Sequence, residues 1–430
     1  MEPADLVILH ASELVTCGTD PGGARGEGLD RLEVIPNGAV AVRDGRLVDV
    51  ATSRDIEKRW HAEQAIDAAG GVVSPGLVDA HSHLVYAGSR HEEYESIVTG
   101  DETATQRLGP GIRYTVRMTR RAAATALRSQ ALRDLDVMLA HGTTTVEAKS
   151  GYGLDREVEL RLLRLLKGLH HAVDVLPTYL AAHIPPDGGA EARRAYIELV
   201  LDTLSVARRY ADYCDVTCDP VGFTAEECRR IADEAIRLGY RLRVHADQTG
   251  YAGGAELAAG CDAVSADHLD FVSRAGMAGL AAARTTGVLV PGVNFHMMDT
   301  MTGVRGGEVT EPTKPFLPQT VHRMIECGVR LAVATDYNPG SSPTLSMQMA
   351  MQLAARLYRL SYAAVWHMST INAAHAVDRA ADRGSIEIGK RADLVIWDVP
   401  HHGMVINRFG TNLVRSVVKD GAVVVKRGAS

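Results

Sequence analysis

The stretch "GLVDAHSHLVYAGSR", residues 76–90, ends a short apolar run with two histidines one residue apart and carries an arginine seven residues later. In an extended strand residues i and i+2 point to the same face. We therefore expect His81 and His83 to project together while Ser82 points away. Two imidazoles on one face make a bidentate ligand, so the stretch predicts a strand that ends at a metal site.

This apolar run is the first of eight, and several of the segments between the runs have helical periodicity. The runs are "GLVDAHSHL", "TTTVEAKS", "DVLPTYLAAH", "YCDVTCD", "RLRVHADQ", "DAVSADHL", "GVLVPGVNF" and "RLAVATD". Short apolar strands that alternate with helices are typical of βα units and a parallel sheet. We predict an α/β fold, a (β/α)8 TIM barrel that forms the catalytic domain over residues 74–380.

Both ends of the chain have a different composition, rich in β-branched residues and turn formers. Residues 1–73 read as short strands, and the same pattern returns in residues 381–430, for example in "ADLVIWDVP" and "VRSVVKDGAVVVKRG". Because chain termini often lie close together, we predict one small β-sandwich-like domain composed of both ends.

Composition narrows the class of protein. The chain has 430 residues, 46% of them apolar and 23% charged, which is ordinary globular usage, and its formal charge is -7 without a basic block. These values argue against disorder and against a general nucleic-acid binder. The six cysteines form no C-x-x-C pair, and the N-terminus has no long apolar run. We expect a cytoplasmic protein with reduced thiols and no membrane segment.

The ends of the predicted strands carry polar side chains. Active sites of such barrels lie at the C-terminal ends of the strands. The residues found there are His81, His83, His183, His245, Asp247, Gln248, Asp267, His268 and Asp336. A single histidine after a strand is most often a satisfied polar residue, but this shared location favours one site.

The first histidine pair needs further ligands to hold a divalent metal. Neutral imidazoles and one carboxylate form a catalytic set that leaves a position open, and His245 and Asp336 complete it. A metal held there lowers the pKa of water and polarises a carbonyl. His268 is either another ligand or a proton shuttle, and we favour the shuttle. Asp336 would contact the metal and accept the proton of the attacking water.

The sequence also predicts how many metal ions bind. Two-metal barrels of this type usually carry a carboxylated lysine after strand four, but that strand ends "CDVTCDP". We predict one ion, zinc or iron, since the ligand set suits both. Lys149, at the end of strand two, either forms an ion pair near the mouth or is solvated.

Several stretches resemble a known family. "PGLVDAHSHLVYAGSR" is similar to the metal-binding first strand of the amidohydrolase superfamily, and "GSIEIGKRADLVIWD" resembles its C-terminal signature. The resemblance narrows to the imidazolonepropionase family in "HSHLVYAGSR", "GTTTVEAKSGYGL", "HADQTGYAGGAELAA", "VSADHL" and "ATDYNPGSSP". The match covers nearly the whole chain in order.

The resemblance implies a homodimeric hydrolase of histidine degradation that opens the cyclic amide of 4-imidazolone-5-propanoate to N-formimino-L-glutamate. It implies metal binding by His81, His83, His245 and Asp336, with His268 near the attacking water. It further implies substrate contacts from Arg90, Tyr152, His183, Gln248, Asn338, Gly340 and Ser341. A guanidinium is a forked cation that suits a carboxylate tail, although Arg90 could instead pair only with Glu92 or Glu93.

Two departures from the family pattern leave the substrate open. Thr103 stands where the family usually has a tyrosine, and the segment after strand seven brings Asn294, His296 and Asp299. One alternative is therefore hydrolysis of a related cyclic amide or amidine, or deamination of a heterocyclic amine. A non-catalytic scaffold is a further alternative, but such proteins typically lose metal ligands and all four are present here.

Overall fold

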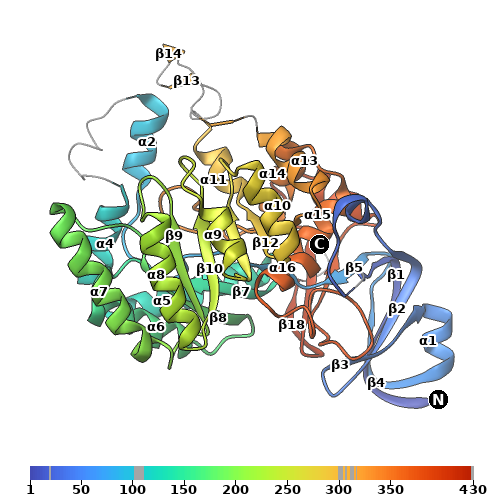
Figure 1. Cartoon of the computed structure of the whole chain (residues 1–430). Coiled ribbons are helices and arrows are strands. Elements are labelled where there is room, and N and C mark those ends of the chain that lie inside the picture. Colours follow the sequence, from blue (N-terminus) through green and yellow to red (C-terminus); the bar gives the residue numbers. More distant parts are fainter. Residues whose placement is uncertain are drawn as a thin grey trace.

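The computed structural model describes residues 1–18, 21–100, 111–298, 304–305, 308–309, 314–315 and 317–427. Two eight-stranded sheets dominate it, one from the middle of the chain and one from its two ends (Figure 1). Among the described helices, we find none with the length and apolar character needed to cross a membrane.

The middle of the chain forms the predicted barrel. Its strands are β6 (Leu77–Asp79), β7 (Thr143–Lys149), β8 (Asp174–Ala182), β9 (Tyr213–Cys218), β10 (Arg241–Ala246), β11 (Ser265–His268), β12 (Thr286–Leu289) and β15 (Arg330–Val333). They lie side by side in chain order, and every pairing between them is parallel. Each of the eight apolar runs supplies one strand, so the predicted (β/α)8 fold is confirmed.

Contacts beyond the strand ends join the first barrel strand to the last. Ser82 and Tyr337 form a parallel bridge, and the amide of Asp336 donates to the carbonyl of His81 at 2.9 Å. Just before this contact on both segments of the chain, Thr335 donates from its amide and its hydroxyl to the buried carboxyl of Asp79. The residues that close the barrel are thus neighbours of the predicted metal ligands.

Helices follow the barrel strands along the chain, as the βα pattern requires. They are α2 (His91–Thr99), α4 (Gly111–Arg121), α5 (Ala124–Ala140), α6 (Arg156–Lys167), α7 (Gly189–Ala207), α8 (Ala225–Arg237), α9 (Gly254–Gly260), α10 (Arg274–Ala283), α11 (Pro291–His296), α13 (Leu317–Glu326), α14 (Met347–Tyr358), α15 (Tyr362–Ser369) and α16 (Ile371–Ala376). Local sequence determines where some of these helices begin. At the start of α8, for example, Thr224 and Glu227 form a capping box. Figure 1 shows α2 and the short pair β13 (Val304–Arg305) and β14 (Glu308–Val309) at the same end of the molecule.

The second sheet is built from both chain ends. Its strands are β1 (Glu2–Val15), β2 (Val34–Arg43), β3 (Arg46–Thr52), β4 (Trp60–Asp67), β5 (Val72–Pro75), β16 (Leu394–Trp397), β17 (Val414–Lys419) and β18 (Ala422–Lys426). The antiparallel pairing of β5 with β16 joins the two ends. The long β1 pairs with β2 on one edge and with β4 and β5 on the other. The 3-10 helix η1 (Gly26–Asp30) and helices α1 (Ser53–Arg59) and α17 (His402–Asn407) complete this part.

Ion pairs connect the terminal sheet to the barrel. Lys419, at the end of β17, pairs with Asp393 and with Asp174, the first residue of β8. Arg383 also reaches Asp174. The domain boundaries at residues 73/74 and 380/381 stay a prediction.

Candidate active site

The polar side chains at the barrel rim come together in space. The His245 ring centroid lies 4.6 Å from that of His81, 5.7 Å from His83 and 5.3 Å from His268. Asp336 Oδ1 lies 3.4 Å from Nε2 of both His81 and His83. All five side chains are buried. The structure therefore brings together the four predicted metal ligands and His268.

Local backbone geometry aims these side chains. Ser82 points away from the histidines on either side of it, because its hydroxyl donates to the carbonyl of Glu147 at 2.7 Å. His268 and Asp336 adopt φ values of 77° and 49°, in the left-handed region that side chains other than glycine rarely take. Such strain persists only where surrounding contacts enforce it, and it is concentrated at functional sites.

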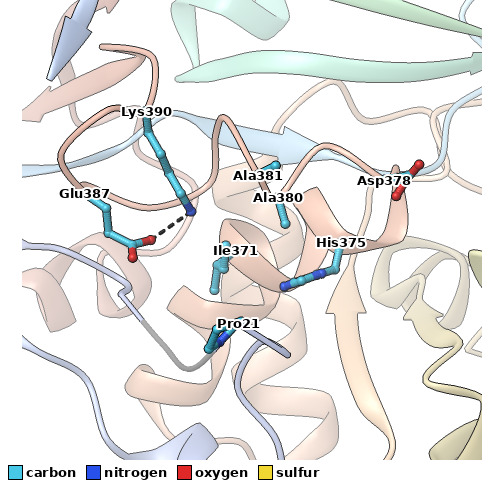
Figure 2. A pocket seen from close by; sticks show the side chains of 8 residues that line it. All are labelled: Pro21, Ile371, His375, Asp378, Ala380, Ala381, Glu387 and Lys390. Atoms are coloured by element: carbon cyan, nitrogen blue, oxygen red, sulfur yellow. Dashed lines mark ion pairs between the residues drawn. The ribbon is translucent and has the colours of Figure 1, made fainter.

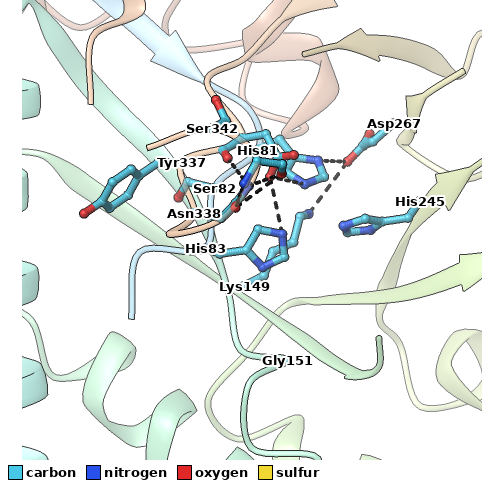
Figure 3. Close-up of polar contacts among 12 residues, drawn as sticks. His81, Ser82, His83, Lys149, Gly151, His245, Asp267, Tyr337, Asn338 and Ser342 are labelled. Carbon is cyan, nitrogen blue, oxygen red and sulfur yellow. Dashed lines mark hydrogen bonds and ion pairs between the residues drawn. The ribbon is translucent and has the colours of Figure 1, made fainter. Parts of the chain in front are cut away.

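Two carboxylates fix the orientation of two of the rings. Nδ1 of His81 donates to Asp267 at 2.6 Å (Figure 3). Nδ1 of His245 donates to Asp215 at 3.0 Å. Because a carboxylate only accepts, each ring carries its proton on Nδ1 and leaves Nε2 bare. The bare nitrogens face the centre of the rim.

Unpartnered atoms at this centre test whether a metal fits. His81 Nε2, His245 Nε2 and Asp336 Oδ1 are buried without a hydrogen-bond partner among the described residues, and burial of such atoms is costly. Burial lowers the pKa of His81 and His83 well below the ordinary value, which keeps them in the neutral form that ligates. The donor set fits a divalent ion.

The donor atoms form more than one close group. His81, His83 and Asp336 make one set with all donor atoms within 4.8 Å of one another; the others are His81 with His245 and His268, and His83 with His183 and His245. Burial raises the pKa of Asp336 to about 7, although His245 and Asn338 act to lower it. A cation at the centre would favour the ionised carboxylate.

A cavity of about 180 Å³ opens from this centre. It is lined by His83, Arg90, Ile112, Tyr152, His183, His245, Gln248, His268, Asp336, Asn338 and Ser341. Six of the seven candidate substrate residues line it. The seventh, Gly340, lies against the Arg90 guanidinium, where a Cβ would collide.

Arg90 forms one of the ion pairs that the sequence left open, the pair with Glu93. Its Nε and Nη2 donate to the Glu93 carboxylate at 2.7 and 2.6 Å, while the guanidinium also lines the cavity. Glu93 accepts from Nε and Nη2 of Arg90, and the remaining Nη1 lies beside Gly340. Arg90 is thus held in place by Glu93 at the edge of the cavity.

Loop contacts place the other cavity residues. Asn338 Oδ1 accepts from the amides of Gly340 and Ser341, and its Nδ2 donates to the carbonyl of Asp336 at 2.7 Å. Gly151 has φ 92° and accepts from Nδ1 of His183 at 2.9 Å; a Cβ there would lie 3.0 Å from that nitrogen. Glycine at position 151 therefore leaves room for the His183 ring to approach and donate to this carbonyl.

The residues that depart from the family pattern lie in different places. Thr103 and Asp299 are outside the described residues. Asn294 is buried, and its Nδ2 donates to the Tyr358 hydroxyl at 2.8 Å. His296 stacks on Tyr94 with ring centroids 4.0 Å apart.

Sequence reasoning missed a group of charges beneath the rim. Glu147, Asp215 and Arg243 are fully buried around Lys149, so the ion-paired alternative for Lys149 is correct and the solvated one is wrong. The available signal was charge within buried strands, in "VEAK" and "RLRVHA".

A larger cavity of about 480 Å³ lies at the other end of the barrel (Figure 2). Asp378, which lines this cavity, pairs with Arg241 at the N-terminal end of β10. The histidines of the rim lie at the C-terminal ends of the strands, so the two cavities are at opposite ends of the barrel. It contains the Glu387–Lys390 ion pair. It is remote from the metal-ligand candidates, so size alone does not identify the active site.

Comparison with known proteins defines the class. The sequence pattern of the amidohydrolase family matches residues 72–424, which include the whole barrel and the rim described above. The chain therefore belongs to the amidohydrolase family, whose members depend on metal ions.

Full-length relatives narrow this class. The chain is 38% identical over 423 residues to the imidazolonepropionase of Caldanaerobacter subterraneus subsp. tengcongensis, with 97% of each sequence covered. It is 39% identical to that of Brevibacillus brevis over 432 residues, with 98% of each covered. Within the amidohydrolases, the chain belongs with the imidazolonepropionases.

Solved structures with lower identity share the fold. E. coli guanine deaminase aligns with a TM-score of 0.70 at 13% identity, over 98% of this chain and 99% of that one. A zinc-bound adenosine deaminase from Xanthomonas campestris aligns with a TM-score of 0.65 at 20% identity, over 99% and 94%. These likenesses concern the fold alone.

Proposed function

We propose that this protein hydrolyses the ring amide of 4-imidazolone-5-propanoate to N-formimino-L-glutamate, a step of histidine degradation. The observation that carries the proposal is the convergence of His81 Nε2, His245 Nε2 and Asp336 Oδ1, all buried and unpartnered among the described residues, on a cavity edged by Arg90. The imidazolonepropionases at 38–39% identity support it.

In this proposal His81, His83, His245 and Asp336 hold one divalent ion, zinc or iron. Both metals accept imidazole and carboxylate ligands. When bound, the ion supplies Lewis acidity, which activates water and polarises the substrate carbonyl. The pre-oriented rings of His81 and His245 lower the cost of assembling the site, because Asp267 and Asp215 already hold them.

The remaining residues would position the substrate and move protons. His268 and Asp336 would hold the attacking water, and Asp336 would pass its proton to the ring nitrogen as the carbon–nitrogen bond breaks. Arg90 would bind the propionate carboxylate, so the substrate would be anionic. Tyr152, His183, Gln248, Asn338, Gly340 and Ser341 would enclose the ring; Tyr152 is buried with its ring centroid 5.4 Å from that of His83.

The test is turnover of imidazolone propanoate by the metal-loaded protein. Chelation of the metal, or His245→Ala, should abolish turnover, because either removes the site. Full activity after either change would refute the proposal. Ammonia release from a panel of ring amines, without turnover of imidazolone propanoate, would favour the deaminase alternative.

We also propose that the protein acts as a homodimer in the cytoplasm. All six cysteines lie in the described part of the chain and none forms a disulfide, which fits a reducing compartment. Light scattering on the purified protein tests the dimer, since a monomeric mass at micromolar concentration would contradict it.

A further inference from the structure

We infer that Lys149 is a positioning residue for the metal site: its ammonium holds Asp215 and Asp267 in place, and these carboxylates fix the His245 and His81 rings with Nε2 facing the metal. The inference deepens the proposed function and rests on its metal site. It assigns a role to a side chain that neither lines the cavity nor belongs to the ligand set.

The contacts of Lys149 are all made inside the barrel. Its Nζ lies 2.8 Å from Asp215 Oδ2, 3.0 Å from Glu147 Oε1 and 3.7 Å from Asp267 Oδ2. The side chains of all four residues are fully buried. Figure 3 shows Lys149 between the strands, with its amino group directed toward Asp267.

Each of the two aspartates contacts one histidine with its carboxylate. Asp215 Oδ1 accepts from Nδ1 of His245 at 3.0 Å and from the His245 amide at 3.2 Å. Asp267 Oδ2 accepts from Nδ1 of His81 at 2.6 Å. These histidines belong to β10 and to the segment after β6, which are not adjacent in the sheet. One lysine therefore links two ligands from non-adjacent parts of the sheet, each through one aspartate.

Charge explains why the link needs a cation. Glu147, Asp215 and Asp267 bring three negative charges, and Lys149 and Arg243 bring two positive ones, so the group carries -1. Arg243 pairs with Asp267 at 3.2 Å and lies 3.7 Å from Glu147. In the described part of the chain the ion pairs of Asp215 are made with Lys149 and His245. Without Lys149, Asp215 would face the other carboxylates with no neighbouring ammonium.

The ammonium is stable where it lies. Burial lowers the pKa of Lys149, but the carboxylates of Asp215, Glu147 and Asp267 raise it, and the pKa ends above the ordinary value. Removal of one partner from a buried ion pair leaves an uncompensated charge. The aspartates would then shift away from one another, and the rings that they hold would lose their fixed direction.

The experiment compares metal binding by Lys149→Met with that by Lys419→Met. Lys419 is a matched control, because it is also buried and paired with carboxylates, those of Asp174, Asp393 and Asp420, but lies at the junction with the terminal sheet. Zinc affinity is measured by competition with a chromogenic chelator, and cobalt absorption reports the ligand geometry. We expect affinity to fall about 10–100-fold in Lys149→Met, as for other residues that orient ligands, and to match wild type in Lys419→Met.

A double variant isolates the charge effect. Asp215→Asn removes one negative charge while its amide oxygen still accepts from His245. We expect Lys149→Met/Asp215→Asn to bind zinc more tightly than Lys149→Met, so that the two substitutions are not additive.

Each outcome decides between the two proposals. A wild-type protein that binds no metal refutes the proposed function, whereas equal affinities of wild type and Lys149→Met overturn only this inference. If Lys149→Met does not fold, the double variant decides: folded protein with recovered zinc affinity supports the inference. A double variant that also fails to fold, or binds zinc no better than Lys149→Met, overturns it.

Discussion

Arg90 shows how one residue joins the fold to substrate recognition. Its bidentate pair with Glu93, within the start of α2, fixes the guanidinium at the cavity edge. A planar fork can hold one carboxylate and still present a donor to a second, which an ammonium cannot do in the same geometry. The pair with Glu93 is therefore compatible with a substrate anchor.

We predict that Arg90→Lys raises KM for imidazolone propanoate more than it lowers kcat. A hydrogen bond to a charged group contributes about 1.5–3 kcal/mol, so KM should rise roughly 10–100-fold. Steady-state kinetics measure it, with Arg54→Lys on the distant helix α1 as the control. An unchanged KM would show that Arg90 only pairs with Glu93.

At the scale of elements, strand ends carry the site, whereas α16 and the segment that follows it supply most of the lining of the remote cavity. Helix α16 places His375 at that cavity, half-buried among positive side chains. Burial, together with the positive charges of Arg330, Lys390 and Arg25, lowers the pKa of His375 to about 3. The folded protein thus keeps this imidazole neutral at a pH where the unfolded chain would bind a proton.

This shift predicts a pH dependence of stability. The stabilisation is complete above the unfolded pKa of about 6.5 and is lost as the pH falls toward 3, because only the unfolded state takes up the proton in that window. The melting temperature should therefore fall on acidification, and fall less in His375→Gln. His61→Gln, an exposed histidine on β4, is the control. Parallel curves for His375→Gln and wild type would contradict the prediction.

At the scale of the whole molecule, the proposed metal would reinforce closure of the barrel. His81 and His83 follow the first strand and Asp336 follows the last, where backbone contacts already join the two. A ligand that binds only the folded state adds about 4 kcal/mol to its stability at a thousandfold excess over Kd.

We predict that chelation lowers the melting temperature of the wild-type protein and that added zinc or iron restores it. Calorimetry measures the shift. His245→Ala should show no comparable shift on chelation, because it has lost the site. A wild-type melting temperature that is unchanged after the metal has been removed would contradict this role.

Several features of the fold and the site could be predicted because their signals are local. The eight strands were found from apolar runs, and the His81–His83 pair from the two-residue period of a strand. Other features could not be predicted: whether Lys149 is solvated depends on Asp215 and Asp267, which lie 66 and 118 residues further along the chain. The Arg90–Glu93 pair was one of several alternatives that short-range spacing alone leaves open.

The sequence by itself thus determined the barrel, the terminal sheet and the candidate donors at the rim, since periodicity and strand order depend on near neighbours. Only the tertiary structure decided which carboxylates orient which imidazoles and that one buried ammonium lies between them. The physical reason is that a charge deep in a barrel is stable only with partners from other strands, and their approach is set by closure of the whole sheet.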